Sequence, residues 1–294
     1  MDAIKTASLT KYYGSSRGIE DMNLSVKEGD FFGFIGPNGA GKSTTIRTLL
    51  GLISPTGGEA QILGMDSARQ KESILSQVGY MPSEASFYRN MRVKDIIRFS
   101  ADLRHRDCLT EAKSLCERLE LDTNKRIREL SLGNRKKVSI VCALQHRPRL
   151  CILDEPTSGL DPLMQREFYA ILKERNEEEG TTIFVSSHIL SEIQRYCRHA
   201  AVIREGRLLA SDTTENLGHT DTRRVRLRGR FTLPDLSHIK DIQTDGDSLS
   251  FLYGGDLNTL MHTLAELPLT DILITEPDLE EIFMHYYTDT ALTH

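Results

Sequence analysis

Two hydrophobic patterns alternate along the first 215 residues of the chain. Short, mainly apolar runs that are candidate strands occur at residues 31–35, 150–153 and 182–185, and a more mixed one at residues 4–9. Longer amphipathic stretches with helical spacing occur at residues 42–50, 162–179 and 189–196. Strands that alternate with helices in this way predict an α/β fold with parallel strands.

Two early segments depart from this alternation. Residues 19–26 and 58–63 have the pattern of additional strands. We expect these strands to pair in antiparallel orientation. The prediction for the first part of the chain is therefore a sheet of mixed character.

The pattern changes again after residue 213. The composition is polar up to residue 221, and a second alternating block then begins at Val225. Strand-like runs at 223–227, 239–244, 249–253 and 269–275 flank helix-like runs at 257–267 and 279–287. We therefore predict a first domain over residues 1–215 and a small α+β domain over residues 222–294, near the lower size limit for independent stability.

Composition and charge exclude several classes of protein. With 37 Lys and Arg against 42 Asp and Glu, the net charge is −5, so no polyanion-binding surface and no nucleic-acid partner are expected. The five cysteines are scattered singly, which suggests neither a disulfide framework nor a zinc site. No run approaches the roughly 18 apolar residues that span a bilayer, so the chain is not expected to cross a membrane itself.

The segment directly after the apolar run 31–35 has the spacing Gly-x-x-x-x-Gly-Lys-Ser. Its residues are Gly36, Pro37, Asn38, Gly39, Ala40, Gly41, Lys42, Ser43 and Thr44. The glycines let backbone N–H groups converge on phosphate oxygens, and the helix that starts near Lys42 adds its positive N-terminus. We expect Lys42 to contact the β- and γ-phosphates of a nucleotide and the Ser43 hydroxyl to bind Mg²⁺.

A second motif ends in two acidic residues. The apolar residues 150–153 are followed by Asp154 and Glu155. A buried strand that ends in carboxylates needs a cation or a proton to neutralise them. Asp154 is therefore expected to support the Mg²⁺ ion, and Glu155 to polarise the attacking water.

Upstream of these acids, Leu130, Ser131, Leu132, Gly133 and Asn134 resemble LSGGQ, the signature loop of the ATP-binding subunits of ABC transporters. Leu132 replaces the first glycine and Asn134 the glutamine. The resemblance implies an α/β P-loop NTPase of ABC type, with a mixed β core and an α-helical signature subdomain over about residues 84–148. In this family the loop closes over the γ-phosphate bound by the opposite subunit, which implies a dimer around two ATP molecules with Ser131 and the backbone of Gly133 as donors across it.

Three further segments match the family at its usual spacing. Residues 158–161, Ser-Gly-Leu-Asp, resemble the D-loop, which implies that Asp161 communicates between the two sites of a dimer. His188 resembles the switch histidine that contacts the γ-phosphate. Tyr13 resembles the aromatic residue that stacks on adenine, with the neighbouring Tyr12 as the alternative.

One position departs from the family pattern. Members usually carry a glutamine after a Gly-Tyr-x-Pro-like strand end, whereas here Pro82 is followed by Ser83 and Glu84. The shorter Ser83 side chain implies a contact with the metal through a water molecule, or its replacement by Glu84. Hydrolytic activity is still expected.

The last part of the chain narrows the type of transporter. Residues 276–284 resemble the tail end of exporter ATPases for drugs, peptides, lipids or sodium, although an ordinary amphipathic helix with an acidic first turn is the alternative. Between residues 83 and 106, Phe87, Tyr88 and Met91 are candidate contacts for a coupling helix of a permease, with packing in the core as the alternative for the two aromatic side chains.

Taken with its motifs, the resemblance implies an ATPase that uses ATP and Mg²⁺, pairs with a second copy and powers export through a separate transmembrane permease. We expect it in the cytoplasm, peripheral on the inner face of the cell membrane, in contact with the membrane only through the permease. The alternatives are a soluble ATPase of this superfamily that acts on nucleic acid or ribosomes, and a non-hydrolysing ATP-binding regulator. Glu155 and His188 argue against the regulator.

Overall fold

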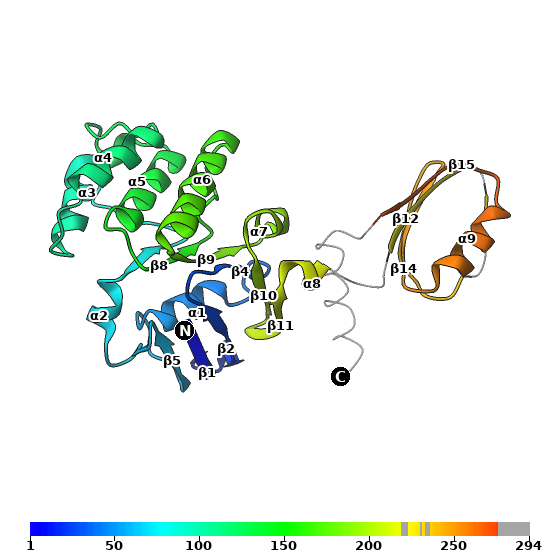
Figure 1. The fold of residues 1–294 in the computed structure, drawn as a ribbon, viewed down its shortest axis with the longest axis horizontal. Coiled ribbons are helices and arrows are strands. Elements are labelled where there is room, and N and C mark those ends of the chain that lie inside the picture. Colours follow the sequence, from blue (N-terminus) through cyan, green and yellow to red (C-terminus); the bar gives the residue numbers. More distant parts are fainter. Residues whose placement is uncertain (219–222, 230, 233–235, 276–294) are drawn as a thin grey trace. The chain divides into compact units, whose positions relative to one another are not determined.

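The computed structural model describes residues 1–218, 223–229, 231–232 and 236–275 of the 294-residue chain. It divides into two compact units, Met1–Thr214 and Glu215–His294. Figure 1 shows the first unit as sheets flanked by helices and the second as a small sheet with one helix against it.

A six-stranded sheet forms the centre of the first unit, in the order β11-β10-β4-β9-β8-β7. Its strands are β4 (Phe31–Ile35), β7 (Val78–Met81), β8 (Leu150–Asp154), β9 (Thr182–Ser187), β10 (His199–Arg204) and β11 (Arg207–Thr213). All neighbours are parallel except β10 and β11. Every residue of β4, β8 and β9 is buried, so the three apolar runs are confirmed as strands, and they are covered on both faces.

A second, antiparallel sheet lies beside the first. It consists of β1 (Asp2–Tyr13), β2 (Ser16–Met22), β3 (Ser25–Lys27), β5 (Gly57–Ile62) and β6 (Met65–Asp66). The expected antiparallel pairing of the early strands is confirmed, and the six-stranded sheet is mixed through β10 and β11, but the expectation that all these strands share one sheet is wrong. Exposed residues recur along β1 and β5, so these strands keep one face toward water, unlike the fully buried strands of the six-stranded sheet.

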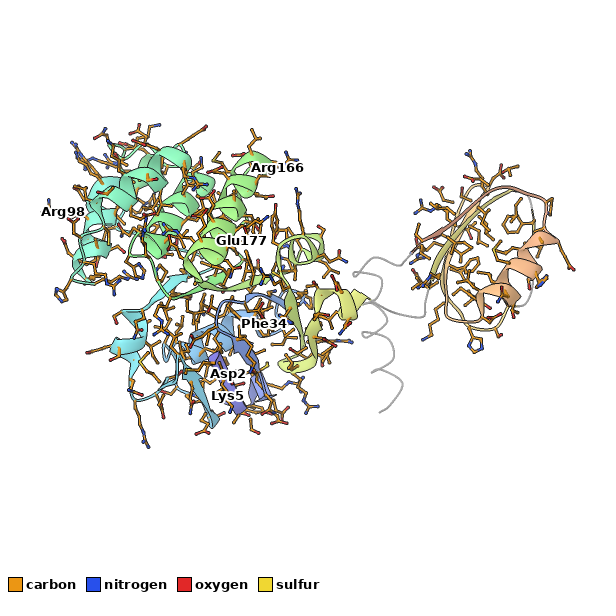
Figure 2. All side chains as sticks on the ribbon, in the orientation of Figure 1. Asp2, Lys5, Phe34, Arg98, Arg166 and Glu177 are labelled. Carbon is orange, nitrogen blue, oxygen red and sulfur yellow. The ribbon has the colours of Figure 1, made fainter. Side chains whose placement is uncertain are left out.

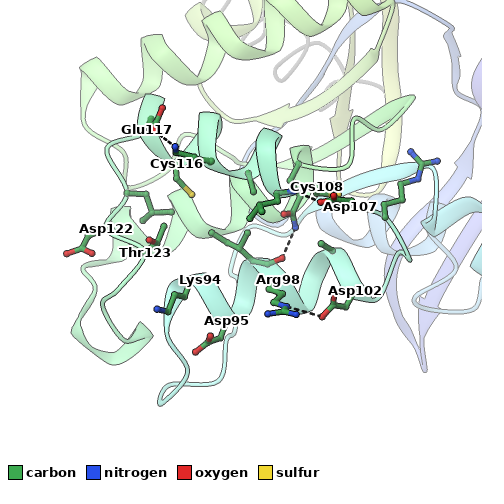
Figure 3. Close-up of a pocket in the computed structure, with 18 of the residues that line it drawn as sticks. Lys94, Asp95, Arg98, Asp102, Asp107, Cys108, Cys116, Glu117, Asp122 and Thr123 are labelled. Atoms are coloured by element: carbon green, nitrogen blue, oxygen red, sulfur yellow. Dashed lines mark hydrogen bonds and ion pairs between the residues drawn. The ribbon is translucent and has the colours of Figure 1, made fainter.

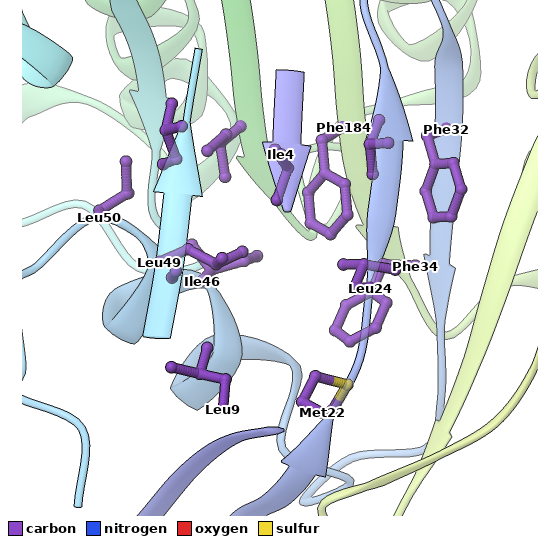
Figure 4. Packing of buried hydrophobic residues seen from close by; sticks show 14 of the residues in the cluster. Ile4, Leu9, Met22, Leu24, Phe32, Phe34, Ile46, Leu49, Leu50 and Phe184 are labelled. Carbon is purple, nitrogen blue, oxygen red and sulfur yellow. The ribbon is translucent and has the colours of Figure 1, made fainter. Parts of the chain in front are cut away.

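Helix α1 (Lys42–Leu49) packs between the two sheets, in contact with β8 on one side and β2 and β5 on the other. Its buried Ile46 and Leu49 belong to the cluster shown in Figure 4. Within that cluster the ring of Phe184 packs against Phe32 and Phe34, with centroids 5.9 and 5.4 Å apart. Apolar contacts from both sheets therefore fix the start of α1, where the predicted phosphate loop ends.

The other helices of this unit are α2 (Lys71–Leu75), α3 (Val93–Asp102), α4 (Leu109–Arg118), the 3₁₀ turn η1 (Ile127–Glu129), α5 (Leu132–Leu144), α6 (Pro162–Glu179) and α7 (Leu190–Tyr196). The prediction of α6 is confirmed at both ends: Pro162 opens it and Gly180, with a φ of 69°, ends it. No helix was predicted at α2, and no strands at β10 and β11. Figure 2 shows Arg98 at the outer edge of α3 and Phe34 inside the unit.

The second unit begins within α8 (Thr214–Gly218). Its sheet has the order β13-β14-β12-β15, from β12 (Arg223–Gly229), β13 (Ile239–Asp245), β14 (Ser248–Tyr253) and β15 (Leu269–Thr275). Helix α9 (Leu257–Ala265) covers one face through Leu260 and Leu264, which pack on Val225 and Phe251. The helix expected at residues 279–287 and the exporter-like segment 276–284 lie outside the described residues.

None of the helices in the described part of the chain has both the length and the apolar character needed to cross a membrane.

Candidate functional site

The loop between β4 and α1 has the backbone geometry of a phosphate cradle. Gly41 caps α1 at a φ of 108°, and a Cβ atom there would lie 2.8 Å from the Gly18 carbonyl oxygen, so only glycine fits. No side chain caps this end of the helix. Its first N–H groups are therefore available to an anionic ligand, which the helix dipole also favours.

Lys42 is buried at the first position of α1. Its Nζ atom donates to the carbonyl oxygens of Gly36 at 2.6 Å and Pro37 at 3.1 Å, and lies 3.1 Å from Glu155 Oε1. A buried ammonium group needs such partners. The structure thus brings the predicted phosphate-binding lysine and the predicted water-polarising carboxylate into direct contact.

Asp154, the last residue of β8, is almost fully buried between two hydroxyl groups. Ser43 Oγ donates to its Oδ2 atom at 2.6 Å, and Ser186 Oγ, from the end of β9, donates to its Oδ1 atom at 2.6 Å. A carboxylate next to a serine hydroxyl is a donor set that suits Mg²⁺, which prefers oxygen ligands. The residues present therefore fit a divalent cation at Ser43 and Asp154.

Glu155 follows β8 in a strained backbone conformation, with a φ of 47°. Its N–H group donates to Ser186 Oγ at 3.0 Å, and its carbonyl oxygen accepts from Lys136 Nζ at 2.9 Å. Its side-chain Oε2 atom lies 3.3 Å from Nδ1 of His188. The carboxylate is therefore held between Lys42 and the predicted switch histidine.

Sequence patterns did not reveal the roles of Ser186 and Lys136. Lys136 lies in the first turns of α5 and is only 5% exposed. Burial lowers its pKa, while Asp154, Glu155 and Glu84 act in the opposite direction. A lysine after the signature loop gives no signal of burial, because lysine is usually exposed; Ser186 could be suspected only from its place at a strand end.

A pocket of about 470 Å³ opens around this cluster, within the usual range for ligand sites. Tyr13, Ser83 and Glu84 line it together with the phosphate loop and Glu155. The Tyr13 ring is 48% exposed, whereas the Tyr12 hydroxyl donates to Glu20 Oε1 at 2.9 Å. Tyr13 is thus the better placed of the two tyrosines for stacking on a base.

The signature residues Ser131, Leu132, Gly133 and Asn134 do not line this pocket, as far as the described residues define it. Ser131 caps α5 instead, because its Oγ accepts from the Asn134 N–H at 3.3 Å, and Leu132 is 59% exposed. A Cβ atom on Gly133 would lie 2.7 Å from the carbonyl oxygen of Gly159, so the loop packs directly on residues 158–161 of its own chain.

Asp161 is likewise engaged locally. Its Oδ1 atom accepts from the N–H groups of Leu163 and Met164 at 3.1 and 3.0 Å, which caps α6. Ser158 lines the pocket, three residues upstream. The structure therefore gathers the phosphate loop, both acids, His188 and Tyr13 into one site, and leaves the signature loop and Asp161 beside it.

A larger cavity, of about 1470 Å³, lies between α3 and α4 (Figure 3). Its floor includes the buried side chains of Ile97, Cys108 and Cys116, and charged residues such as Lys94 and Arg98 surround it. None of the predicted site residues lines it among the described part of the chain. Its lining contains no phosphate loop, so this cavity does not fit the chemistry of the Lys42 site.

Residues 19–158 match the sequence model of the ABC transporter family. Among curated proteins, the bacitracin transport ATP-binding protein BcrA of Bacillus licheniformis is 35% identical over 298 residues, which cover 96% of each chain. The probable multidrug ABC transporter ATP-binding protein YbhF of Escherichia coli is 36% identical over 73% of this chain, which spans only 38% of that protein.

Solved structures show the same fold. The ATP-binding subunit of an ABC transporter superposes with a TM-score of 0.68 at 30% identity, over 73% of this chain and 91% of that one. A dimeric bacterial ABC transporter cassette gives a TM-score of 0.67 at 24% identity, over 72% of this chain and 98% of that one.

Proposed function

This chain belongs to the family of ABC transporter ATP-binding proteins, and from that premise we propose that it hydrolyses ATP to power export through a separate transmembrane permease. The observation that carries the proposal is the contact of Glu155 with both Lys42 and His188, at 3.1 and 3.3 Å. This contact gathers in one site a lysine that can bind phosphate, a carboxylate that can polarise water and a histidine, which are groups that hydrolysis of a terminal phosphate uses.

Lys42 and the N-terminus of α1 bind the phosphates. With ATP in the pocket, the Lys42 ammonium group exchanges its contacts with the Gly36 and Pro37 carbonyls for phosphate oxygens, which neutralises charge that grows in the transition state. Ser43 and Asp154 would hold Mg²⁺, which supplies further charge neutralisation when bound. Ser83 would contact that ion through a water molecule, or Glu84 would take its place; both residues line the pocket.

Glu155 acts on the attacking water. The carboxylate orients the water in line with the γ-phosphate and accepts its proton, while His188 contacts the phosphate oxygens. The backbone of Glu155 is pinned on both sides, at its N–H by Ser186 and at its carbonyl by Lys136. Release from Lys42 on ATP binding frees the carboxylate for this role.

Two copies are needed for a complete site. Ser131 and Gly133 do not line the pocket of their own chain, and the exposed Leu132 and the uncovered start of α5 can face a second copy. In the proposed homodimer, the signature loop of each chain closes over the ATP bound by the other, and Asp161 lies at the shared boundary. The relatives named for bacitracin and multidrug transport favour export as the coupled process.

ATPase rate measured against protein concentration tests this proposal. We expect the specific rate of the wild type to rise with concentration, and Glu155→Gln to lose hydrolysis by about 10²-fold or more while it still binds ATP. Glu177→Gln, on the exposed face of α6, is the matched control and should retain the wild-type rate. An undiminished Glu155→Gln rate would overturn the mechanism, and ATP binding without wild-type hydrolysis would favour the regulator.

We propose that the protein binds its permease through a surface around residues 83–106. This contact would hold the protein at the inner face of the cell membrane. Tyr88 is 71% exposed there, an unusual position for a large aromatic side chain, while Phe87 and Met91 are half-buried beside it. We expect Tyr88→Ala to reduce co-purification with the permease and leave basal ATPase activity unchanged. Met261→Ala, at an exposed apolar residue of the second unit, is the control and should affect neither.

A further inference from the structure

Glu192, on α7, accepts hydrogen bonds from three hydroxyl groups at a single carboxylate oxygen. Its Oε2 atom lies 3.1 Å from Thr157 Oγ1, 3.1 Å from Ser187 Oγ and 3.3 Å from the Tyr169 hydroxyl. All three donors are buried. This carboxylate is therefore the acceptor on which three buried O–H groups from different segments converge.

Two of the donors belong to the loops on either side of the catalytic carboxylate. Thr157 lies two residues after Glu155 and immediately before residues 158–161. Ser187 is the last residue of β9 and immediately precedes His188. Tyr169, by contrast, belongs to the middle of α6 and to neither loop. Glu192 thus joins the segment that leads to Asp161 with the segment that carries His188.

Each loop is also anchored individually. Ser187 Oγ accepts from the Ile189 N–H at 2.9 Å, which ties the backbone on both sides of His188 to the same hydroxyl. Gln165 Nε2 donates to the carbonyl oxygen of Leu160 at 3.1 Å, which holds the turn before Asp161. Because each loop is internally fixed, a link between Thr157 and Ser187 transmits displacement of one loop to the other.

The chemistry favours a firm link. Hydrogen bonds to a carboxylate are stronger than those between neutral groups, and buried hydroxyls without an acceptor are destabilising. Burial, with a contribution from Glu192, raises the pKa of Tyr169 well above its usual value, so that this hydroxyl stays protonated and donates. Movement of the Thr157 loop away from Glu192 would leave the buried Thr157 hydroxyl without this acceptor, whereas Ser187 Oγ also lies 3.3 Å from the Ile189 carbonyl oxygen as a second acceptor.

We propose that Glu192 is a positioning residue that couples residues 158–161 to His188 within one chain. Closure of the dimer on the first segment then sets the position of the histidine at the γ-phosphate, although Glu192 itself does not line the nucleotide pocket. The inference rests on the proposed ATP hydrolysis and adds an internal link between the dimer contact and the catalytic histidine.

A double-mutant cycle, with kcat for ATP hydrolysis as the measured quantity, tests the link between Thr157 and Ser187 through Glu192. Thr157→Val and Ser187→Ala each remove one donor, and each should lower kcat by about 10-fold with KM for ATP within about 2-fold of the wild type. Because both break the same link, the double variant should lose little more than either single one. In a Glu192→Ala background, which itself lowers kcat by about 10-fold, the same two substitutions should each change kcat by less than about 2-fold.

Tyr169→Phe is the matched control, because it removes the third donor and keeps the link between the loops. It should lower stability and leave kcat within about 2-fold of the wild type. Glu192→Gln keeps an acceptor oxygen at this position and should retain most of the rate, which also covers the case in which Glu192→Ala fails to fold. Binding of a fluorescent ATP analogue verifies that each variant is folded.

The outcomes separate this inference from the proposed function. If the Thr157→Val and Ser187→Ala losses multiply in the double variant, or if Tyr169→Phe is as impaired as Glu192→Ala, Glu192 has no coupling role. If Glu192→Gln loses as much as Glu192→Ala, the geometric link proposed here is wrong. A wild-type chain with no ATPase activity would overturn the proposed function and, with it, this inference.

Discussion

The two units of the chain bury different kinds of side chain. In the first unit, Lys42, Lys136 and Asp154 are buried together at the carboxyl ends of parallel strands. In the second, the core around Phe251 and Leu260 is apolar, and Arg224 is its one buried charged or polar side chain among the described residues. Burial of charge needs compensating partners, and the first unit provides them at its ligand site.

This difference assigns the proposed catalytic site to the first unit and leaves the second unit with an apolar core. Parallel strands end at the same edge of a sheet, so residues from β4, β8 and β9 meet there. The antiparallel sheet of the second unit has no such edge, and α9 covers one face of it with apolar residues alone. Substitutions at the ligand site of the first unit should therefore act mainly on activity, and those in the core of the second unit on local stability.

The largest effect is expected at Lys42. Lys42→Ala removes the buried cation that contacts Glu155 and that we propose binds the phosphates, and ATP hydrolysis should fall by on the order of 10³-fold. Lys173→Ala, on the exposed face of α6, is the control and should have the wild-type rate. Steady-state ATPase assays measure both. If Lys42→Ala lost less than 10-fold, the division of roles between the units would not hold.

Leu260→Ala tests the other side of the comparison. The substitution leaves a cavity under α9, and the second unit should lose about 3 kcal/mol of stability. Hydrogen exchange with mass spectrometry should show faster exchange in β12, β14 and α9, with protection of β4 and β8 unchanged. ATPase activity should stay at the wild-type level; its loss would mean that catalysis depends on the packing of the second unit.

His146 should make the stability of the first unit depend on pH. Burial, followed by the nearby Arg104, lowers the pKa of His146 to about 4, so the folded state holds it neutral. The unfolded state binds a proton near pH 6.5, so stability is fully present above that pH and falls as the pH drops toward 4. Between pH 8 and pH 5 the loss should be about 2 kcal/mol.

The variant His146→Gln isolates this contribution, because the amide does not titrate. Urea unfolding at pH 8 and pH 5 should show a loss that is smaller by about 2 kcal/mol in the variant than in the wild type. Equal losses in the two proteins would show that His146 is already protonated, or exposed, in the folded chain.

The smallest effect is expected at an ion pair on the surface of the first unit. Arg118, on α4, pairs with Glu167 at 2.6 Å and with both carboxylate oxygens of Glu174 on α6. The partners are a third to a half exposed, so Arg118→Gln should cost about 1 kcal/mol at low salt and less at high salt. Arg98→Gln, whose pair with Asp102 is 4.0 Å long and exposed, should change thermal stability even less.

Much of the fold was predictable from the pattern of apolar residues. The strands β4 and β8 and the helix α6 lie where their hydrophobic periodicity and caps place them, because these signals act within a few residues. The separation into two sheets was not predictable, since strand pairing depends on where α1 packs. The signature loop could be found as a motif, although its place beside the pocket could not.

The sequence by itself determined the local chemistry of this protein: a glycine-rich turn before Lys42, a buried strand that ends in Asp154 and Glu155, and a histidine after another strand. Only the tertiary structure decided which distant groups complete it. Ser43 meets Asp154 across 111 positions, Lys136 reaches the Glu155 carbonyl, and Glu192 joins two loops. Periodicity encodes burial and backbone conformation, whereas such contacts depend on strand order and on which helix crosses which strand end.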